Sequence, residues 1–272
     1  MINPVLAQMA VYPFTRLEEE RRRLLAAGVE VIDFGKGDPN EPTDPMIRRA
    51  LVEALPERAP CPLAQGLPEL RQAAAGWLGR RFGVGVDPDA EIVPTYGSKE
   101  AIFSLAQVVG TSGRVVAFGE PAYPVYERGA LFAGARVQTL PLRRENGFLP
   151  DLGAIPDEVA RRAKLLWLNY PNNPTAAVAP RSFFADAIRF AERHGVILCH
   201  DAAYAEIYFG ERPPSILELP GGREVAIEFH SLSKTFSMTG WRVGFAVGHP
   251  ELIAGLGRVK TNVDSGVFQA VQ

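Results

Sequence analysis

The sequence predicts an α/β protein built on a mostly parallel sheet of seven strands, with helices covering both faces. Helical stretches alternate with short apolar runs from Pro45 onward, as in proteins whose parallel strands are joined by crossover helices. Several of these runs are apolar at both alternating positions, which is expected of strands buried on both faces. With 272 residues, 47% of them hydrophobic, the chain can form one large core or two modest ones.

The first 43 residues are predicted to form an N-terminal arm and the first part of a small domain. Residues 17–27 mix leucine with charged residues in a helical pattern, and Gly28 is placed to end that helix. Residues 31–34 predict a short strand, and the glycines and proline of residues 35–39 predict a loop after it. Residues 44–272 would then form the large domain.

In the large domain, the periodicity predicts helices over residues 45–55, 67–82, 98–108, 122–134, 180–194 and 250–260. It predicts strands over residues 92–95, 114–118, 136–140, 164–168, 196–200, 225–230 and 243–248. Ligands of such sheets bind outside the carboxyl ends of the strands, so the residues that follow each strand are the candidates for function.

The composition indicates an ordinary soluble protein of the cytoplasm. A net charge of −2 gives no reason to expect nucleic acid or an anionic membrane as partner. No apolar run approaches the roughly 20 residues that span a bilayer, and residues 1–4 do not resemble a secretion signal. Cys61 and Cys199 lack metal-ligand spacing, and the four histidines form no ligand pattern, so neither a disulfide framework nor a metal site is predicted.

Two strand ends carry groups suited to a phosphate. Gly97 and Ser98 open a helix after the strand at 92–95, where free backbone N–H groups favour an anion. Ser98 could instead be a simple helix N-cap. After the strand at 225–230, Ser231, Ser233 and Arg242 supply hydroxyl and guanidinium donors for a dianionic phosphate.

Three other strand ends carry side chains suited to a flat ring. Tyr123 follows the strand at 114–118, where it could cover a planar ligand or pack in the core. Residues 169–175 hold asparagines framed by prolines, and such a turn can aim an amide at a ligand. Asp201 follows a buried strand and needs a partner such as a protonated pyridine nitrogen, although it could also be a helix N-cap.

Lys234 stands beside Ser231 and Ser233, four residues after the end of the strand at 225–230. A neutral lysine forms an imine with an aldehyde, and a poorly solvated site near other cations favours the neutral form. A surface lysine would explain neither the flanking serines nor Arg242. One ligand accounts for the phosphate site, the ring contacts and the lysine together, namely pyridoxal 5′-phosphate.

With these motifs in this order, the chain resembles the class I/II aminotransferases of fold type I, which are transaminases dependent on pyridoxal phosphate. The resemblance extends from about Tyr12 to Gln272 and is most specific over residues 229–248. It implies that Lys234 forms the Schiff base with the cofactor and then moves protons. It also implies that Asp201 keeps the ring nitrogen protonated.

The resemblance implies the remaining contacts as well. Tyr204 and Asn173 would bond the phenolic oxygen of the ring, and Tyr123 would stack on the ring. The phosphate would lie among Gly97, Ser98, Lys99, Ser231, Ser233 and Arg242. The substrate carboxylate would lie near the Gly37 backbone and Asn173.

Within this family, the stretches 168–174, 200–204, 229–234 and 260–266 resemble LL-diaminopimelate aminotransferases. The opening residues 3–14 are also similar to N-succinyldiaminopimelate aminotransferases. The resemblance implies a homodimer in lysine biosynthesis, with glutamate and 2-oxoglutarate as the second substrate pair. Aspartate or alanine as amino donor remains an alternative.

Three features depart from the family pattern. Cys61 stands where the family usually has a tyrosine that reaches the phosphate of the partner subunit, and Ala176 stands where it usually has glycine. The family is also longer, so we expect that the C-terminal part of the small domain is missing, together with the arginine that binds the substrate carboxylate. A protein ending at Gln272 should then bind the cofactor weakly and transaminate poorly.

Two other classes remain open. A carbon–sulfur lyase on the same scaffold would share Lys234 and Asp201, and it would release pyruvate and ammonia without a keto-acid acceptor. A regulatory module that binds the cofactor without catalysis is the other class. A basic helix-turn-helix segment at the N-terminus would favour it, and this sequence shows none.

Overall fold

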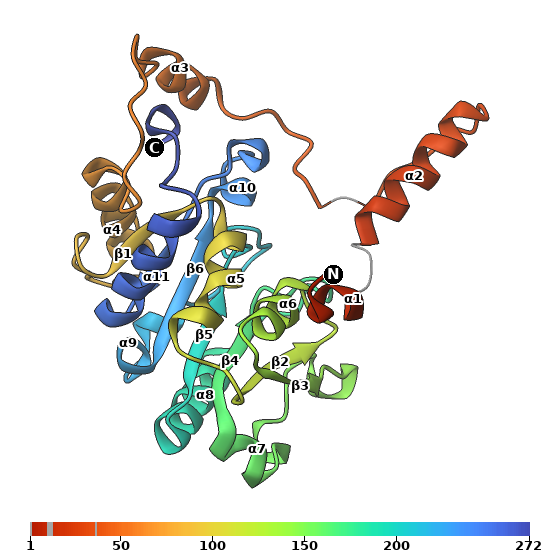
Figure 1. Cartoon of the computed structure of the whole chain (residues 1–272), viewed down its shortest axis with the longest axis vertical. Coiled ribbons are helices and arrows are strands. Elements are labelled where there is room, and N and C mark those ends of the chain that lie inside the picture. The colour runs from red at the N-terminus through yellow and green to blue at the C-terminus, as the bar shows by residue number, and fades with distance from the viewer. Residues whose placement is uncertain (1, 10–12, 36) are drawn as a thin grey trace.

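A sheet of seven strands runs through the computed structural model, which describes residues 2–9, 13–35 and 37–272 (Figure 1). The strands are β1 (Ile92–Thr95), β2 (Val115–Glu120), β3 (Arg136–Pro141), β4 (Ala163–Asn169), β5 (Ile197–Asp201), β6 (Ala226–Ser231) and β7 (Gly244–Gly248). Their order is β1-β7-β6-β5-β4-β2-β3. Strands β2 to β6 pair in parallel, and β7 is antiparallel to both of its neighbours. The predicted fold class is confirmed.

Helices cover both faces of this sheet. The helices of the described residues are α1 (Pro4–Gln8), α2 (Pro13–Ala26), α3 (Pro45–Glu53), α4 (Pro68–Phe82), α5 (Ser98–Val108), α6 (Val125–Phe132), α7 (Asp157–Arg162), α8 (Arg181–His194), α9 (Gly222–Val225), α10 (Leu232–Thr235) and α11 (Pro250–Val263). Short 3-10 turns lie at Arg144–Asn146, Leu152–Ala154, Ile216–Glu218, Thr239–Trp241 and Gln269–Val271.

The side chains of each strand alternate between two separate apolar cores. On β4, Leu166 and Leu168 pack with α4 and α8, whereas Leu165 and Trp167 pack with α5, α6 and α11. We call these two sides the α8 face and the α5 face; Figure 1 looks onto the α5 face. Because both faces are covered, strands such as β2 and β4 are apolar at most positions, which made them recognisable in the sequence.

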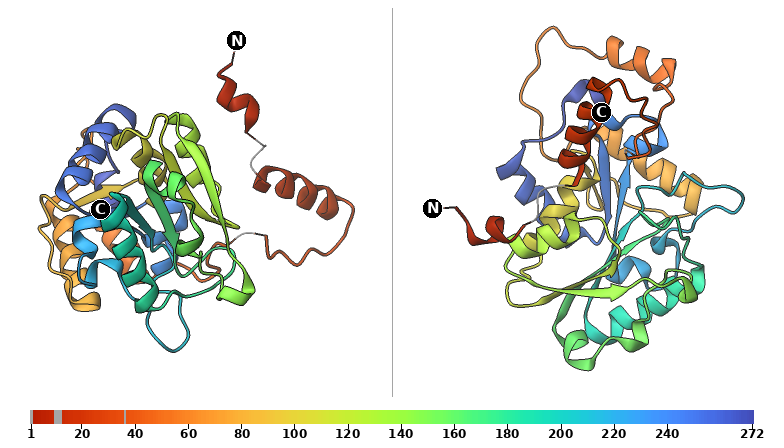
Figure 2. Two further views of the ribbon diagram at one scale, coloured as in Figure 1. Left: turned by 90° about the horizontal axis from the view of Figure 1, so that it is seen from below. Right: turned by 90° about the vertical axis from the view of Figure 1, so that its right-hand side faces the viewer.

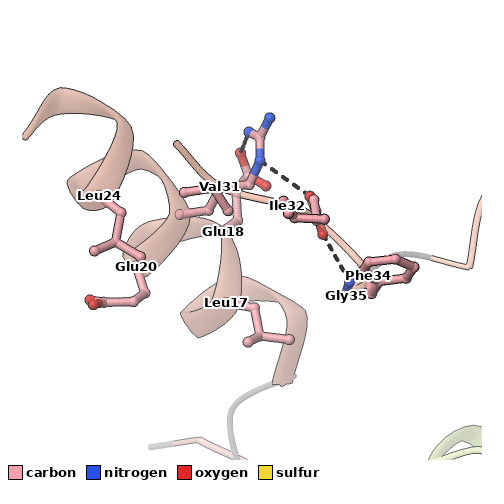
Figure 3. A pocket seen from close by; sticks show the side chains of 10 residues that line it. Leu17, Glu18, Glu20, Leu24, Val31, Ile32, Phe34 and Gly35 are labelled. Atoms are coloured by element: carbon pink, nitrogen blue, oxygen red, sulfur yellow. Dashed lines mark hydrogen bonds and ion pairs between the residues drawn. The ribbon is translucent and has the colours of Figure 1, made fainter. Parts of the chain in front are cut away.

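The N-terminal arm stands away from the sheet, as Figures 1 and 2 show for α2. Residues 31–34 do not form the predicted strand. The segment lies extended beside α2, held by an ion pair of 3.2 Å between Arg21 Nε and Asp33 Oδ2, and together they line a shallow pocket (Figure 3). Phe34 is 93% exposed, and none of the described strands pairs with this segment. An apolar run without a pairing partner gains no ladder of hydrogen bonds, so the local pattern alone was insufficient.

Two kinds of feature are absent from the described residues. They include no helix that is both long and apolar enough to cross a membrane. They also include no group of three or more histidine, cysteine, aspartate or glutamate side chains able to hold a metal ion.

The turn between β4 and α8 is organised by Asn172. Its side-chain oxygen accepts from the Thr175 backbone N–H at 3.1 Å and from the Thr175 hydroxyl at 2.7 Å. Its backbone oxygen accepts from the Ala176 N–H at 2.8 Å. This closed turn leaves Ala176 with a φ of 60°, in the left-handed region that favours glycine.

We predict that Ala176→Gly stabilises the protein by about 0.5–1 kcal/mol. Relief of the left-handed strain, worth about 1–2 kcal/mol, should exceed the extra chain entropy of glycine in the unfolded state. Ala177→Gly is the matched control and should destabilise, because Ala177 is not in that region. Urea denaturation of both variants checks this, and equal destabilisation by the two substitutions would contradict it.

Candidate functional site

The predicted site residues gather where β4, β5 and β6 end and where α5 begins. Asn173 follows β4, Asp201 ends β5, and Lys234 lies in α10 directly after β6. Parallel strands place their carboxyl ends at one edge of the sheet, so residues distant in sequence meet there.

The loop before α5 forms a cradle against Arg242. Gly97 is the N-cap residue of α5 with a φ of 66°, and a Cβ at this position would overlap the Arg242 guanidinium. Arg242 Nη1 donates to the Thr239 carbonyl at 2.8 Å, and Nη2 lies 3.4 Å from the Tyr96 carbonyl. The N-cap alternative for Ser98 is wrong, because Ser98 is the first helical residue and Gly97 occupies the cap. Lys99 lies exposed in the first turn of α5.

The short helix α10 carries the second part of the cradle. Ser231 ends β6 and caps α10, its hydroxyl accepting from the Ser233 N–H at 3.2 Å. Both serines are buried. The Thr239 hydroxyl donates to the Ser233 carbonyl at 3.3 Å, which links α10 to the turn that holds Arg242. The predicted phosphate residues of the two strand ends therefore share one cradle.

Asp201 is buried on the α5 face and holds a partner that the sequence did not reveal. The Tyr126 hydroxyl donates to Asp201 Oδ2 at 2.7 Å, and the Ala203 N–H donates to Oδ1 at 3.2 Å. Asp201 is followed by a turn rather than a helix, so its N-cap alternative is wrong. Burial raises the pKa of Asp201 above its ordinary value, although the Tyr126 hydrogen bond opposes the increase.

The Tyr126 ring is fixed by stacking on Trp167, with centroids 4.8 Å apart and an interplanar angle of 13°. Burial raises the pKa of Tyr126 well above its ordinary value, and the adjacent Asp201 adds to the increase, so Tyr126 remains a donor. Tyr123 contacts Tyr126 edge-on at 5.9 Å. A tyrosine three residues after Tyr123 was the only sequence signal for Tyr126, and apolar packing explains such a signal equally well.

Asn173 and Tyr204, the two residues expected to bond the phenolic oxygen of the ring, lie next to each other. Asn173 Nδ2 lies 3.2 Å from the Tyr204 hydroxyl oxygen. The Asn173 N–H donates to Asn169 Oδ1 at 2.8 Å, and Asn169 Nδ2 donates to the Asp201 carbonyl at 2.9 Å. Asn169 therefore sets the position of Asn173 relative to Asp201.

Lys234 is directed toward the N-terminal arm. Its Nζ donates to the Gly37 carbonyl at 2.6 Å and lies 3.2 Å from Asp38 Oδ1. The side chain is only 17% exposed. The lysine and the backbone predicted near the substrate carboxylate are thus in contact.

A buried ion pair behind the cradle was missed by the sequence reasoning. Lys260 of α11 is fully buried, and its Nζ lies 2.8 Å from Glu100 Oε2 and 3.2 Å from Asp264. Glu100 Oε2 also accepts from the Tyr96 N–H at 3.0 Å, which fixes the start of the cradle. Burial raises the pKa of Glu100, while Lys260 opposes the increase. Residues 160 positions apart give no local signal of such a pair.

These residues fit pyridoxal phosphate. The cradle presents a guanidinium and the backbone N–H groups that open α5, which suits a phosphate. Asp201 is buried, and the donors to its carboxylate among the described residues are a neutral hydroxyl and a backbone N–H, so a cation beside it would be stabilised. Gly244 keeps the cradle tight, because a Cβ there would lie 2.9 Å from the Ser98 nitrogen.

We predict that Asp201 makes the apoprotein less stable as the pH rises. With its pKa raised, the folded chain binds the proton more tightly than the unfolded chain, whose pKa is about 4. The favourable contribution is present below that value and is lost as the pH rises through the folded pKa. The free energy of unfolding of Asp201→Asn, relative to wild type, should therefore increase between about pH 4 and about pH 7. Urea denaturation measures it, and a difference independent of pH would contradict this.

Comparison with known proteins identifies the family. The family model described as aminotransferase class I and II matches residues 29–271. The chain is 49% identical over 271 residues to LL-diaminopimelate aminotransferase 2 of Trichormus variabilis, covering 98% of this chain and 70% of that protein. It is 51% identical over 264 residues to LL-diaminopimelate aminotransferase of Aquifex aeolicus, covering 96% of this chain and 68% of that protein.

Comparison with solved structures leads to the same family. Substrate-bound BacF of Bacillus subtilis matches with a TM-score of 0.94 and 34% identity, over 100% of this chain and 69% of that one. A probable N-succinyldiaminopimelate aminotransferase of Thermus thermophilus matches with a TM-score of 0.88 and 37% identity, over 95% of this chain and 70% of that one. The chain belongs to the class I and II aminotransferases.

Proposed function

We propose that this protein is an LL-diaminopimelate aminotransferase of lysine biosynthesis, with glutamate and 2-oxoglutarate as the second pair. The observation that carries the proposal is the identity of about one half, over nearly the whole chain, to relatives of that name. The 272 residues span about 70% of the length of the first of these relatives. The similarity to a probable N-succinyldiaminopimelate aminotransferase makes that donor the principal alternative.

The family uses pyridoxal phosphate, which supplies an electron sink for the substrate. Ser231, Ser233, Arg242 and the loop of Gly97, Ser98 and Lys99 would hold its phosphate, as the shared cradle supports. Asp201 would hold a proton on the ring nitrogen, because a buried carboxylate favours a cation beside it. Tyr204 and Asn173 would bond the phenolic oxygen, and Tyr123 would cover the ring.

Lys234 would bind the aldehyde carbon of the cofactor with loss of water and, once the substrate amine has displaced it, would take up the proton of the substrate Cα. Its Nζ can do this from its place after β6, where it lies at hydrogen-bond distance from the Gly37 carbonyl. The contact supports the Gly37 backbone as a neighbour of the substrate carboxylate, and Asn173 would be the second neighbour. Tyr126 would keep Asp201 in position throughout, since its hydroxyl is bonded to the carboxylate.

The division into an arm with part of a small domain, residues 1–43, and a large domain, residues 44–272, remains part of this proposal. So do a cytoplasmic location and a homodimer, which agree with two unpaired cysteines and with the exposed helix α3. No residue of α3 is buried, and Met46 and Val52 are 65% and 67% exposed. Such a face would be covered by a second copy of the chain.

We predict that borohydride reduction of the protein with bound pyridoxal phosphate attaches the pyridoxyl group to Lys234. Mass spectrometry of the digested protein locates the group. Lys234→Arg should abolish the modification, whereas Lys164→Arg, which replaces a lysine of β4, should leave it unchanged. Modification at another lysine would overturn the assignment of Lys234.

The substrate is tested by the absorption spectrum of the bound cofactor in the full-length protein. We expect LL-diaminopimelate to convert the aldehyde form of the cofactor to its amine form, and 2-oxoglutarate to reverse the change. N-succinyl-LL-diaminopimelate, aspartate and alanine are the parallel additions. Conversion by one of these alone would replace the proposed donor, and pyruvate release without a keto acid would indicate a lyase.

The dimer is tested by sedimentation equilibrium. We predict that Val52→Glu weakens self-association at least tenfold, because it places a charge in an apolar contact. Glu53→Gln on the same helix is the control and should have little effect. A wild-type protein that sediments as a monomer would contradict the dimer.

A further inference from the structure

A second polar cluster lies behind the proposed site, on the α8 face of the sheet. Adjacent residues of a strand point to opposite faces, so His200 lies on the far side from Asp201, and His230 on the far side from Ser231. Glu228 stands opposite His200 in the pairing of β5 with β6. Glu228 is completely buried, His200 is 1% exposed, and His230 is 4% exposed.

Four groups donate to the Glu228 carboxylate. Oε2 lies 2.7 Å from His200 Nδ1, 2.9 Å from the Ser215 hydroxyl and 3.1 Å from the Ile216 nitrogen. Oε1 lies 2.7 Å from His230 Nε2. An ionised carboxylate with its lone pairs occupied is the form that matches these donors.

His200 faces an acceptor at each ring nitrogen. Besides Nδ1 at Glu228, its Nε2 lies 3.0 Å from the Tyr170 carbonyl oxygen. A neutral imidazole has one N–H, so it would direct a lone pair at one of these buried acceptors. The ring also contacts the uncharged Phe184 of α8, with ring centroids 4.9 Å apart.

The contacts of His230 require hydrogen on only one of its two ring nitrogens. Its Nε2 can donate to Glu228 as a neutral ring, and the ring stacks on Phe245 at 4.9 Å with Trp77 edge-on at 5.1 Å. One cation at His200 then balances one anion at Glu228, which is the arrangement a fully buried pair requires.

We propose that the His200 ring is a permanently protonated imidazolium that forms an ion pair with the Glu228 carboxylate. This ion pair positions the residues of the site on the opposite face of the sheet. Its hydrogen bonds join the residue after β4 to β5 and β6. These three strand ends supply Asn173, Asp201 and Lys234. The positive charge behind β5 also favours the ionised form of Asp201. The effect on cofactor binding rests on the proposed function, whereas the charge of His200 does not.

The charge is tested by ¹⁵N NMR of histidine-labelled full-length holoenzyme, with His200→Gln and His230→Gln used for assignment. Both ring nitrogens of His200 should carry hydrogen at neutral pH, because each of them faces a buried acceptor. The exposed His249 is the reference in the same spectrum. A His200 with one unprotonated nitrogen at neutral pH would overturn the proposal, and this measurement requires no substitution in the cluster.

The positioning role is tested with Glu228→Gln, which keeps the size of the side chain and removes the charge. We expect the His200 ring to become neutral and the dissociation constant for pyridoxal phosphate to rise roughly tenfold. Ser215→Ala is the matched control, because it removes one donor and leaves the ion pair; the dissociation constant should change less than about twofold. Equal losses in the two variants would contradict a role for the charge. Loss of the Lys234 modification in wild type would instead contradict the proposed function alone.

Discussion

A carboxylate buried at the end of a central strand is stabilised by a cation beside it, and this requirement organises the site around Asp201. Water cannot solvate the charge there, so its energy depends on the groups that the fold provides. Tyr126 offers a neutral hydrogen bond from α6, and Asn169 ties the backbone of Asp201 to the turn after β4. Neither of these contacts supplies a positive charge, so the site suits a ring nitrogen that takes up a proton.

Three layers keep that carboxylate in place. On the α5 face, Trp167 stacks on Tyr126, which holds Asp201. In the sheet, parallel pairing brings the ends of β4, β5 and β6 to one edge. On the α8 face, the pair of His200 and Glu228 connects the same strand ends. The cradle at the start of α5 is held separately by the ion pair of Lys260 with Glu100, so the cradle and Asp201 are held by different contacts.

The local hydrophobic pattern predicted most of the strands and helices, because strands covered on both faces are apolar at most positions. It failed for residues 31–34, where an apolar run has no strand to pair with among the described residues. It also missed α7, a helix of six residues whose charged pattern lacks an apolar stripe. The antiparallel direction of β7 depends on how the chain returns between Lys234 and Gly244, which periodicity does not record.

The site residues that follow strands could be found from the sequence, because the position of a ligand in such sheets is a property of the topology. The residues that hold these site residues in position could not be found from the sequence. Tyr126 had no signal beyond an apolar helix, and the four histidines showed no ligand spacing although His200 and His230 share one carboxylate. These contacts join residues of different elements on one face, so they become visible only when the register of β5 against β6 is known.

The most direct measurement compares the affinity of the protein for pyridoxal phosphate with its affinity for an analogue that has carbon in place of the ring nitrogen. If Asp201 pairs with a protonated ring nitrogen, wild type should prefer the natural cofactor by roughly 10- to 100-fold, as expected for a charge-assisted hydrogen bond of about 1.5–3 kcal/mol. Asp201→Asn should lose most of that preference. Equal affinity of wild type for the two compounds would contradict the pairing on which the site is built.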